Sequence, residues 1–369
     1  MKVPVCDLKA GYLPIREQVL ESIAECLEGM QLFLGPNVRG FEQEWAAYCG
    51  VPHAIGLANG TDAIILLLKA AGIGPGDEVI TTPFTFFATV EAIGHVGATP
   101  VFVDIDPATY CLDPSLLEAA ISPQTRGIIA VHLYGHPADM DPLAAIARAH
   151  DLLLIEDAAQ AHGAEYNGRR IGSLADGAAF SFYFTKNLGA YGEAGAVTTA
   201  NDAIAAALGE LRNHGETAKY VHDRIGYNNR LDEIQAAILR IRLPLLDEHN
   251  DRRRAIAARY TAALAGTRLQ LPSEAAWARH VYHLYVVRSS RRDALAQHLA
   301  EREIGFSLHY KLPCHLQPAV RALIGEPPSL PVAEAAAEQV LGLPMFPQLT
   351  EEQQEYVIEA VLDFEGRAG

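Results

Sequence analysis

Short apolar runs alternate with helix-like segments between residues 50 and 200, and this alternation constrains the fold more than any other feature of the sequence. Strands that are apolar along their whole length must be covered on both faces, and crossover helices supply that cover. The alternation therefore predicts an α/β fold with a mostly parallel central sheet flanked by helices. The expected strands are 54–58, 78–82, 100–104, 126–133 and 152–156, and the expected helices are 61–71, 86–96, 113–121 and 141–150.

The pattern changes after residue 200. Helix-like segments come first, and a second mixed set of strands and helices follows them. The sequence thus predicts a smaller α+β C-terminal domain, and we divide the chain into a large domain over residues 1–250 and a small domain over residues 251–369. The expected elements are helices at 201–213, 231–243 and 252–265, strand 283–288, helix 291–302, strand 305–310 and helices near 332–341 and 350–363.

Charge and composition exclude several classes of function. The chain has 29 Lys and Arg against 45 Asp and Glu, a net charge of −16, which argues against nucleic acid as a partner. The start of the chain lacks the apolar stretch of a signal peptide, and no segment reaches the ~18 apolar residues that span a bilayer. We expect a cytoplasmic protein with no membrane partner. The spacing of the histidines predicts no metal site.

Ligands of open parallel sheets bind outside the carboxyl ends of the strands, so the residues at those ends are the candidates for chemistry. Strand 54–58 is followed by Asn59-Gly60-Thr61 at the start of a helix. A glycine, a hydroxyl and a helix N-terminus suit a phosphate group, although a simple capped turn accounts for the same residues. Strand 78–82 is followed by a cluster of phenylalanines that could stack on a flat ring or belong to the core.

Two charged residues follow other predicted strands. Asp157 ends an apolar run, where it could pair with a protonated ring nitrogen or cap the next turn. Lys186 follows an aromatic strand, where it is either a surface lysine or an amine of lowered pKa that acts as a nucleophile. A phosphate turn, a stacking ring, an acid and an amine are together the parts of a pyridoxal 5'-phosphate (PLP) pocket.

The sequence also resembles the DegT/DnrJ/EryC1/StrS family of PLP-dependent sugar aminotransferases over nearly its whole length. This resemblance implies the fold of the fold-type I aminotransferases and a large PLP-binding domain. The matching motifs lie at residues 34–42, 59–63, 156–163, 181–182, 186–190, 226–237 and 343–345.

The resemblance also implies roles for individual residues. Lys186 would form the Schiff base with PLP and shuttle protons, and Asp157 would pair with the pyridinium nitrogen. Phe86 would stack on the cofactor ring, and Gln160 would hydrogen-bond its phenolic oxygen.

Other matching residues would hold the cofactor phosphate, and they imply a shared active site. Gly60, Thr61 and Ser181 would bind the phosphate within one subunit. Asn228 would reach the phosphate of the neighbouring subunit's cofactor, which makes a homodimer necessary for a complete site.

The implied reaction moves an amino group from L-glutamate to a keto group of a nucleotide-linked sugar, with the cofactor alternating between PLP and pyridoxamine phosphate (PMP). Motifs at 186–190, 308–310 and 315–318 resemble those of 3-aminotransferases, so we expect amination at C3 of a dTDP- or UDP-linked sugar. The candidates for binding the sugar or the donor are Tyr183, Arg230, His309 and Tyr310.

Two alternatives stay open at this stage. Amination of a 4-keto sugar or of a cyclitol ketone would use the same cofactor residues. A protein of another class, a non-catalytic PLP-binding regulator, could share the fold, although the presence of both Lys186 and Asp157 argues against it. An absorbance spectrum with and without glutamate distinguishes a regulator from an enzyme.

Overall fold

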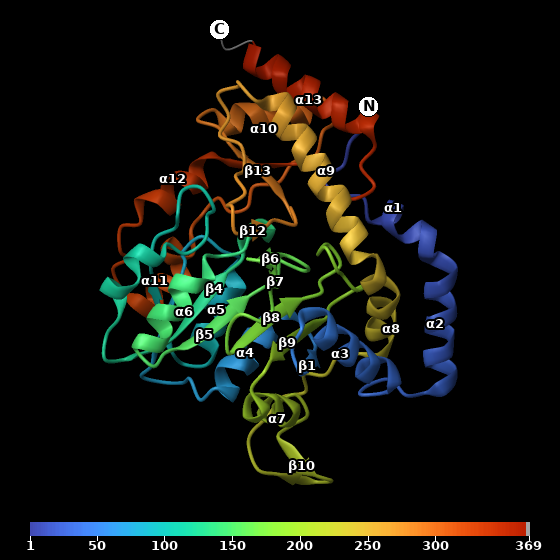
Figure 1. The fold of residues 1–369 in the computed structure, drawn as a ribbon, viewed down its shortest axis with the longest axis vertical. Helices are drawn as coiled ribbons and strands as arrows, with labels where there is room; N and C mark the ends of the chain where they lie inside the picture. The colour runs from blue at the N-terminus through green and yellow to red at the C-terminus, as the bar shows by residue number, and fades with distance from the viewer. Residues whose placement is uncertain (367–369) are drawn as a thin grey trace.

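A seven-stranded sheet lies at the centre of the computed structural model, which describes residues 1–366 (Figure 1). The strands follow the order β1-β9-β8-β5-β4-β2-β3. Their bounds are β1 His53–Leu57, β2 Glu78–Thr81, β3 Thr99–Phe102, β4 Thr125–Val131, β5 Leu153–Asp157, β8 Gly177–Ser181 and β9 Gly195–Thr199.

Most of the sheet is parallel, as the sequence predicts. Strands β3, β2, β4, β5 and β8 pair in parallel, whereas β9 runs antiparallel to both of its neighbours, β8 and β1. Strand β1 therefore points the same way as β8. The carboxyl ends of β1, β2, β5 and β8 consequently lie along one edge of the sheet, which is where ligands of open sheets bind.

Helices cover both faces of the sheet. Leu154 and Ile155 are neighbours on β5 but belong to opposite cores, because successive side chains of a strand point to opposite faces. One core includes residues of α4, α5 and α7, and the other includes residues of α3, α6 and α8. The bounds of these helices are α3 Pro36–Cys49, α4 Gly60–Ala70, α5 Phe87–His95, α6 Met140–Ala149, α7 Asp202–Leu211 and α8 Glu233–Arg242.

Two expected elements do not form. The segment 113–121 makes two short 3-10 turns, Pro114–Leu116 and Glu118–Ala120, in place of a helix. Pro123 disfavours helical geometry at the residue before it, so a helix here has little room to extend. Where strand 305–310 is expected, Ser307 forms an isolated bridge with Gly342, and His309 and Tyr310 lie in a turn.

The C-terminal part packs around a separate core. In this core a pair of antiparallel strands packs with helices α9, α10 and α13 and with Val3 at the start of the chain, whereas α11 and α12 pack with residues of the large part such as Phe84. Figure 1 accordingly shows the N-terminus beside α13. The elements are α9 Leu246–Leu264, β13 Tyr285–Arg288, α10 Arg292–Glu301, α11 Pro318–Ile324, α12 Pro331–Gln339, β14 Val340–Leu343 and α13 Glu351–Gly366.

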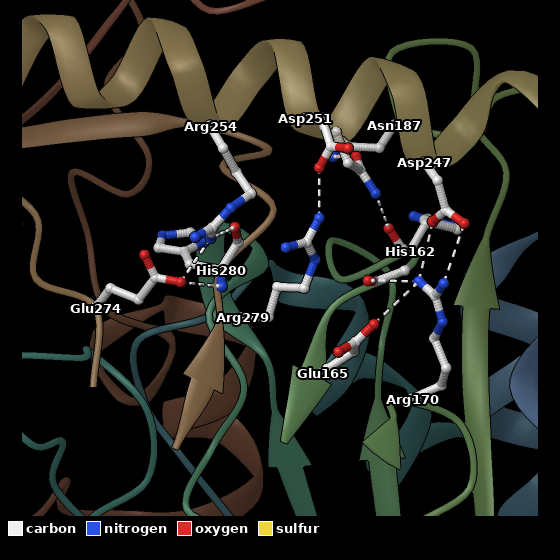
Figure 2. A network of polar contacts seen from close by, with 12 residues as sticks. His162, Glu165, Arg170, Asn187, Asp247, Asp251, Arg254, Glu274, Arg279 and His280 are labelled. Atoms are coloured by element: carbon white, nitrogen blue, oxygen red, sulfur yellow. Dashed lines mark hydrogen bonds and ion pairs between the residues drawn. The ribbon is translucent and has the colours of Figure 1, made fainter. Parts of the chain in front are cut away.

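Helix α9 connects the two parts, and the predicted division at residue 250 falls inside it. Its first half faces the large part, where Asp247 pairs with Arg170 at 3.0 Å and Asp251 pairs with Arg279 (Figure 2). Its second half, including Tyr260, packs into the C-terminal core. The division into domains stays a prediction.

The remaining elements are peripheral. Helices α1 (Leu8–Tyr12) and α2 (Arg16–Gly29) precede the sheet. Strands β10 (Glu216–Ala218) and β11 (Val221–His222) form a hairpin that projects beyond α7 in Figure 1. A small three-stranded sheet consists of β6 (Glu165–Tyr166), β7 (Arg169–Arg170) and β12 (Ala278–Arg279).

Candidate active site

A cavity of about 970 Å³ opens at the carboxyl edge of the sheet. Most of the residues singled out in the sequence line it, even though they come from segments far apart in the chain. They are Gly60, Thr61, Phe86, Asp157, Gln160, Ser181, Tyr183, Lys186, His309 and Tyr310.

Lys186 lies in the loop after β8, five residues beyond the last residue of that strand. Burial lowers the pKa of its amine from the ordinary 10.5 to about 8, and the negative charge of Asp157 opposes this shift. A lysine of pKa near 8 is partly neutral at physiological pH, and the neutral amine is the nucleophilic form.

The residue after the lysine fixes its loop. Asn187 is buried and donates from Nδ2 to Asn250 Oδ1 on α9 at 2.9 Å and to the Val281 carbonyl at 3.1 Å. Its own Oδ1 lies 3.1 Å from His283 Nδ1. Figure 2 shows Asn187 beside α9. The loop that carries Lys186 is therefore held by α9 and by the segment 281–283.

Asp157 is the last residue of β5 and is buried. The Thr89 hydroxyl donates to its Oδ2 at 2.7 Å, and the Ala159 N–H donates to its Oδ1 at 3.2 Å. Thr89 in turn lies 2.8 Å from the Thr85 hydroxyl. These two donors fix the position of the carboxylate at the edge of the cavity.

The start of α4 forms an anion cradle. The Asn59 side chain accepts from the Asp62 N–H at 2.9 Å, and the Asn59 carbonyl accepts from the Ala63 N–H at 3.1 Å. The N–H groups of Gly60 and Thr61 precede the bonds of the helix and stay available for a ligand. A Cβ on Gly60 would lie 2.5 Å from Ser181 Cβ, so only glycine permits this close approach.

Gln160 and two aromatic residues form another part of the wall. Gln160 accepts from the Tyr134 N–H at 2.7 Å and donates to the Tyr310 hydroxyl at 3.1 Å. Phe86 is 57% exposed, and its ring centre lies 6.1 Å from that of Tyr310. The open face of Phe86 is thus available to a flat ligand.

Asn228 and Arg230 lie apart from this group. They line a second cavity of about 480 Å³, which shares Asn59 and Glu193 with the first. Arg230 donates to Asn213 at 3.2 Å, and its guanidinium lies 4.2 Å from the centre of the Phe33 ring. Within one chain these two residues therefore lie outside the cavity that contains Lys186.

The residues of the first cavity fit PLP. An amine of lowered pKa, a buried carboxylate with its own hydrogen-bond donors and a glycine-dependent anion cradle each match a different part of that molecule. A profile of the DegT/DnrJ/EryC1/StrS aminotransferase family matches residues 14–362. The chain belongs to this family.

Individual relatives agree with this assignment. A dTDP-3-amino-3,4,6-trideoxy-alpha-D-glucose transaminase of Streptomyces venezuelae is 49% identical, with 99% of this chain and 97% of the relative covered. A pleiotropic regulatory protein of Geobacillus stearothermophilus is 48% identical, with 99% of each chain covered. The crystal structure of S. venezuelae DesV in complex with a ketimine intermediate has a TM-score of 0.96 and 49% identity, with 99% of this chain and 98% of that chain covered.

The family match confirms the predictions of an aminotransferase and of its fold. Sequence reasoning missed Thr89, which contacts Asp157, and Asn187, which holds the loop of Lys186. Thr89 stands in an apolar helix, and a polar residue on a buried helix face was the signal that could have identified it. Asn187 directly follows Lys186, but nothing local indicates its contact with α9.

Among residues 1–366, no group of three or more His, Cys, Asp or Glu side chains is arranged to hold a metal ion. In the same range, no helix combines the length and the apolar character that crossing a membrane requires.

Proposed function

We propose that this PLP-dependent aminotransferase moves the amino group of L-glutamate to the C3 keto group of a dTDP- or UDP-linked sugar. The observation that carries the proposal is the buried Lys186 amine, with its pKa near 8, which shares a cavity of about 970 Å³ with Asp157. This cavity is large enough for the cofactor and part of a second ligand.

Each residue of the cavity has a different role in the proposed reaction. Bound PLP supplies an aldehyde for the amine and a ring that withdraws electrons from the reacting carbon. Asp157, held by the Thr89 hydroxyl, would keep a proton on the ring nitrogen. Lys186 Nζ would move the proton to and from the α-carbon of the donor. Phe86 would pack against the ring, and the Gly60 and Thr61 N–H groups would bind the phosphate.

The proposal of a sugar substrate rests on relatives and on the cavity wall. The S. venezuelae relative is named for a dTDP-linked 3-amino sugar, and it is 49% identical over nearly the whole chain. Tyr183, His309 and Tyr310 line the cavity and offer polar groups to a sugar. The competing substrates are a 4-keto sugar and a cyclitol ketone.

One experiment separates these substrates. Purified protein loaded with PLP is given glutamate together with 3-keto or 4-keto dTDP- and UDP-sugars, or with a cyclitol ketone, and NMR identifies the aminated carbon. We expect an amino group at C3. Amination at C4 only, or of the cyclitol only, would refute the substrate assignment while leaving the aminotransferase assignment intact.

A homodimer with shared sites is the second part of the proposal. Asn228 lines a separate cavity that adjoins Asn59, and apolar residues are exposed nearby, including Phe33 in the same cavity. Leu27 and Met30 of the α2 end are exposed as well. A second subunit would cover these apolar groups and bring its own Asn228 to the phosphate.

Subunit mixing tests the shared site. Lys186→Ala and Asn228→Ala homodimers should each have little activity. In a mixed dimer one site carries both defects and the other carries neither, so random exchange should restore about a quarter of wild-type activity. No recovery after proven subunit exchange would show that each chain completes its own site.

A regulatory function is the second candidate, because the G. stearothermophilus relative is named a pleiotropic regulatory protein. Glutamate should bleach the yellow PLP-loaded protein if it is an enzyme, since the amino group passes to the cofactor. An unchanged spectrum at saturating glutamate would favour the regulator. The cytoplasmic location expected from the sequence stays a prediction.

A further inference from the structure

Three buried polar atoms in the wall of the active-site cavity have no hydrogen-bond partner among residues 1–366. They are Arg253 Nε, Ser307 Oγ and His309 Nδ1. All three residues line the same cavity as Lys186, and all three belong to the C-terminal side of it. Leaving a buried polar atom without a partner costs free energy, and a ligand commonly fills that need at a functional site.

Arg253 is the most unusual of the three. It is 4% exposed, and its Nη1 donates to the carbonyls of Tyr282, His283 and Met345 at 3.3, 3.4 and 3.1 Å. Within the described part of the chain, no carboxylate forms an ion pair with it. A guanidinium stays protonated in proteins, so Arg253 is a buried cation balanced only by carbonyl dipoles.

The free side of this guanidinium has a specific shape. Nη1 makes all three bonds, which leaves Nε–H and the N–H groups of Nη2 for another acceptor. Nε–H and one Nη2–H are parallel donors on one edge of the planar group. That edge matches the two oxygens of a carboxylate in a bidentate contact.

Ser307 and His309 supply donors from a neighbouring segment. Ser307 exchanges two backbone bonds with Gly342, at 3.0 and 2.8 Å, which holds the segment extended there. His309 follows two residues later, in a turn, and it lines the same cavity as Ser307. Burial and the positive charge of Lys186 lower the pKa of His309, so its ring is neutral and can donate one N–H.

We propose that Arg253, Ser307 and His309 bind a carboxylate group of the amino donor. This inference rests on the proposed aminotransferase function, in which a carboxylate-bearing donor must reach Lys186. The phosphate of the cofactor has its own cradle at α4, so it does not need these groups. A sugar acid is another source of a carboxylate, and the test below distinguishes it from the donor.

The test uses two substitutions in the PLP-loaded protein. Arg253→Lys keeps the charge but removes the Nε–H edge, and Ser307→Ala removes one hydroxyl while leaving the backbone bonds intact. Arg259→Lys, on the same helix but paired with Glu355, and Ser289→Ala, a buried serine away from the cavity, are matched controls. Thermal unfolding of every variant checks that each one folds.

Two measurements follow for each protein. Calorimetry gives the Kd of succinate, a dicarboxylate that has no amino group to transfer. Stopped-flow absorbance gives the rate of bleaching against glutamate concentration, in the absence of any sugar. We expect Arg253→Lys to raise both the succinate Kd and the half-saturating glutamate concentration by about 10- to 100-fold. We expect Ser307→Ala to raise them about 5-fold and the controls to change them less than about 2-fold.

Each outcome decides a separate question. Unchanged succinate and glutamate binding in both variants would refute the subsite, as would a wild-type protein that binds no succinate. If Arg253→Lys weakens the binding of a carboxylate-bearing keto sugar but not of succinate or glutamate, the site belongs to the sugar and the donor role is refuted. Arg253-dependent succinate binding in a protein that reacts with no amino donor would support the subsite while the proposed aminotransferase function fails. If Arg253→Lys does not fold, Ser307→Ala still decides the matter.

Discussion

Removing the positive charge of Lys186 should stabilise the cofactor-free protein. Lys186 is half-buried in the cavity that it shares with Asp157, and desolvation lowers the pKa of its amine from 10.5 to about 8. The folded state therefore releases this proton more easily than the unfolded chain does. At pH 7 the folded protein holds a charge that its surroundings disfavour, and Lys186→Met removes that charge with a side chain of similar length.

The size of the effect follows from the pKa. The fall from 10.5 to about 8 corresponds to about 3 to 4 kcal/mol at ~1.4 kcal/mol for each pKa unit. This value is an upper limit, because water in the cavity solvates part of the amine. Asp157 loses a nearby cation in the variant, but it keeps its bonds from the Thr89 hydroxyl and the Ala159 N–H.

The stability difference between Lys186→Met and wild type should depend on pH. Below pH 8 lysine is protonated in both states, so the folded wild type carries the whole penalty. Between pH 8 and 10.5 the unfolded chain binds more protons than the folded one, so wild-type stability rises with pH. The advantage of Lys186→Met should therefore be largest at or below pH 7 and should shrink as the pH approaches 10.5.

Urea unfolding of the cofactor-free proteins at pH 7 and pH 9.5, at one protein concentration, measures this difference. We expect a higher free energy of unfolding for Lys186→Met at pH 7 and a smaller gap at pH 9.5. Lys9→Met, at an exposed lysine of α1, is the control and should show no such gap. The reasoning about burial would be refuted if wild type and Lys186→Met had equal free energies of unfolding at pH 7. It would also be refuted if their difference were as large at pH 9.5 as at pH 7.

Three further predictions concern the loaded enzyme. Thr89→Val removes the hydroxyl that donates to Asp157 at 2.7 Å, and it should lower kcat about 10-fold with little change in Tm, as steady-state kinetics and thermal unfolding will show. Asp157→Asn removes the negative charge that holds the ring proton and should lower kcat by roughly 100-fold or more, and normal turnover would argue against that role. Gly60→Ala places a Cβ 2.5 Å from Ser181 Cβ and should weaken PLP retention roughly 10-fold, as titration of the apoprotein measured by absorbance will test.

Local patterns were sufficient for the fold class and for much of the site. The apolar alternation between residues 50 and 200 predicted a mostly parallel sheet, and β1, β2, β4 and β5 form close to the expected bounds. Asp157 and Lys186 were found because Asp157 ends β5 and Lys186 lies in the loop after β8, and the carboxyl ends of parallel strands meet at one edge. The failures, at 113–121 and 305–310, occurred where the pattern was short and the pairing partner lay far away.

The sequence by itself thus determined the α/β class, the family and the amine and acid of the site, because these depend on short-range periodicity and on residues next to strand ends. Tertiary structure decided which other groups join them. Arg253 stands between the exposed Arg252 and the half-buried Arg254, and only the contacts of α9 select it as the cation that lines the cavity. Asn228 was likewise assigned to a separate cavity by the packing of the chain. Such choices depend on contacts between distant segments, which no local pattern contains.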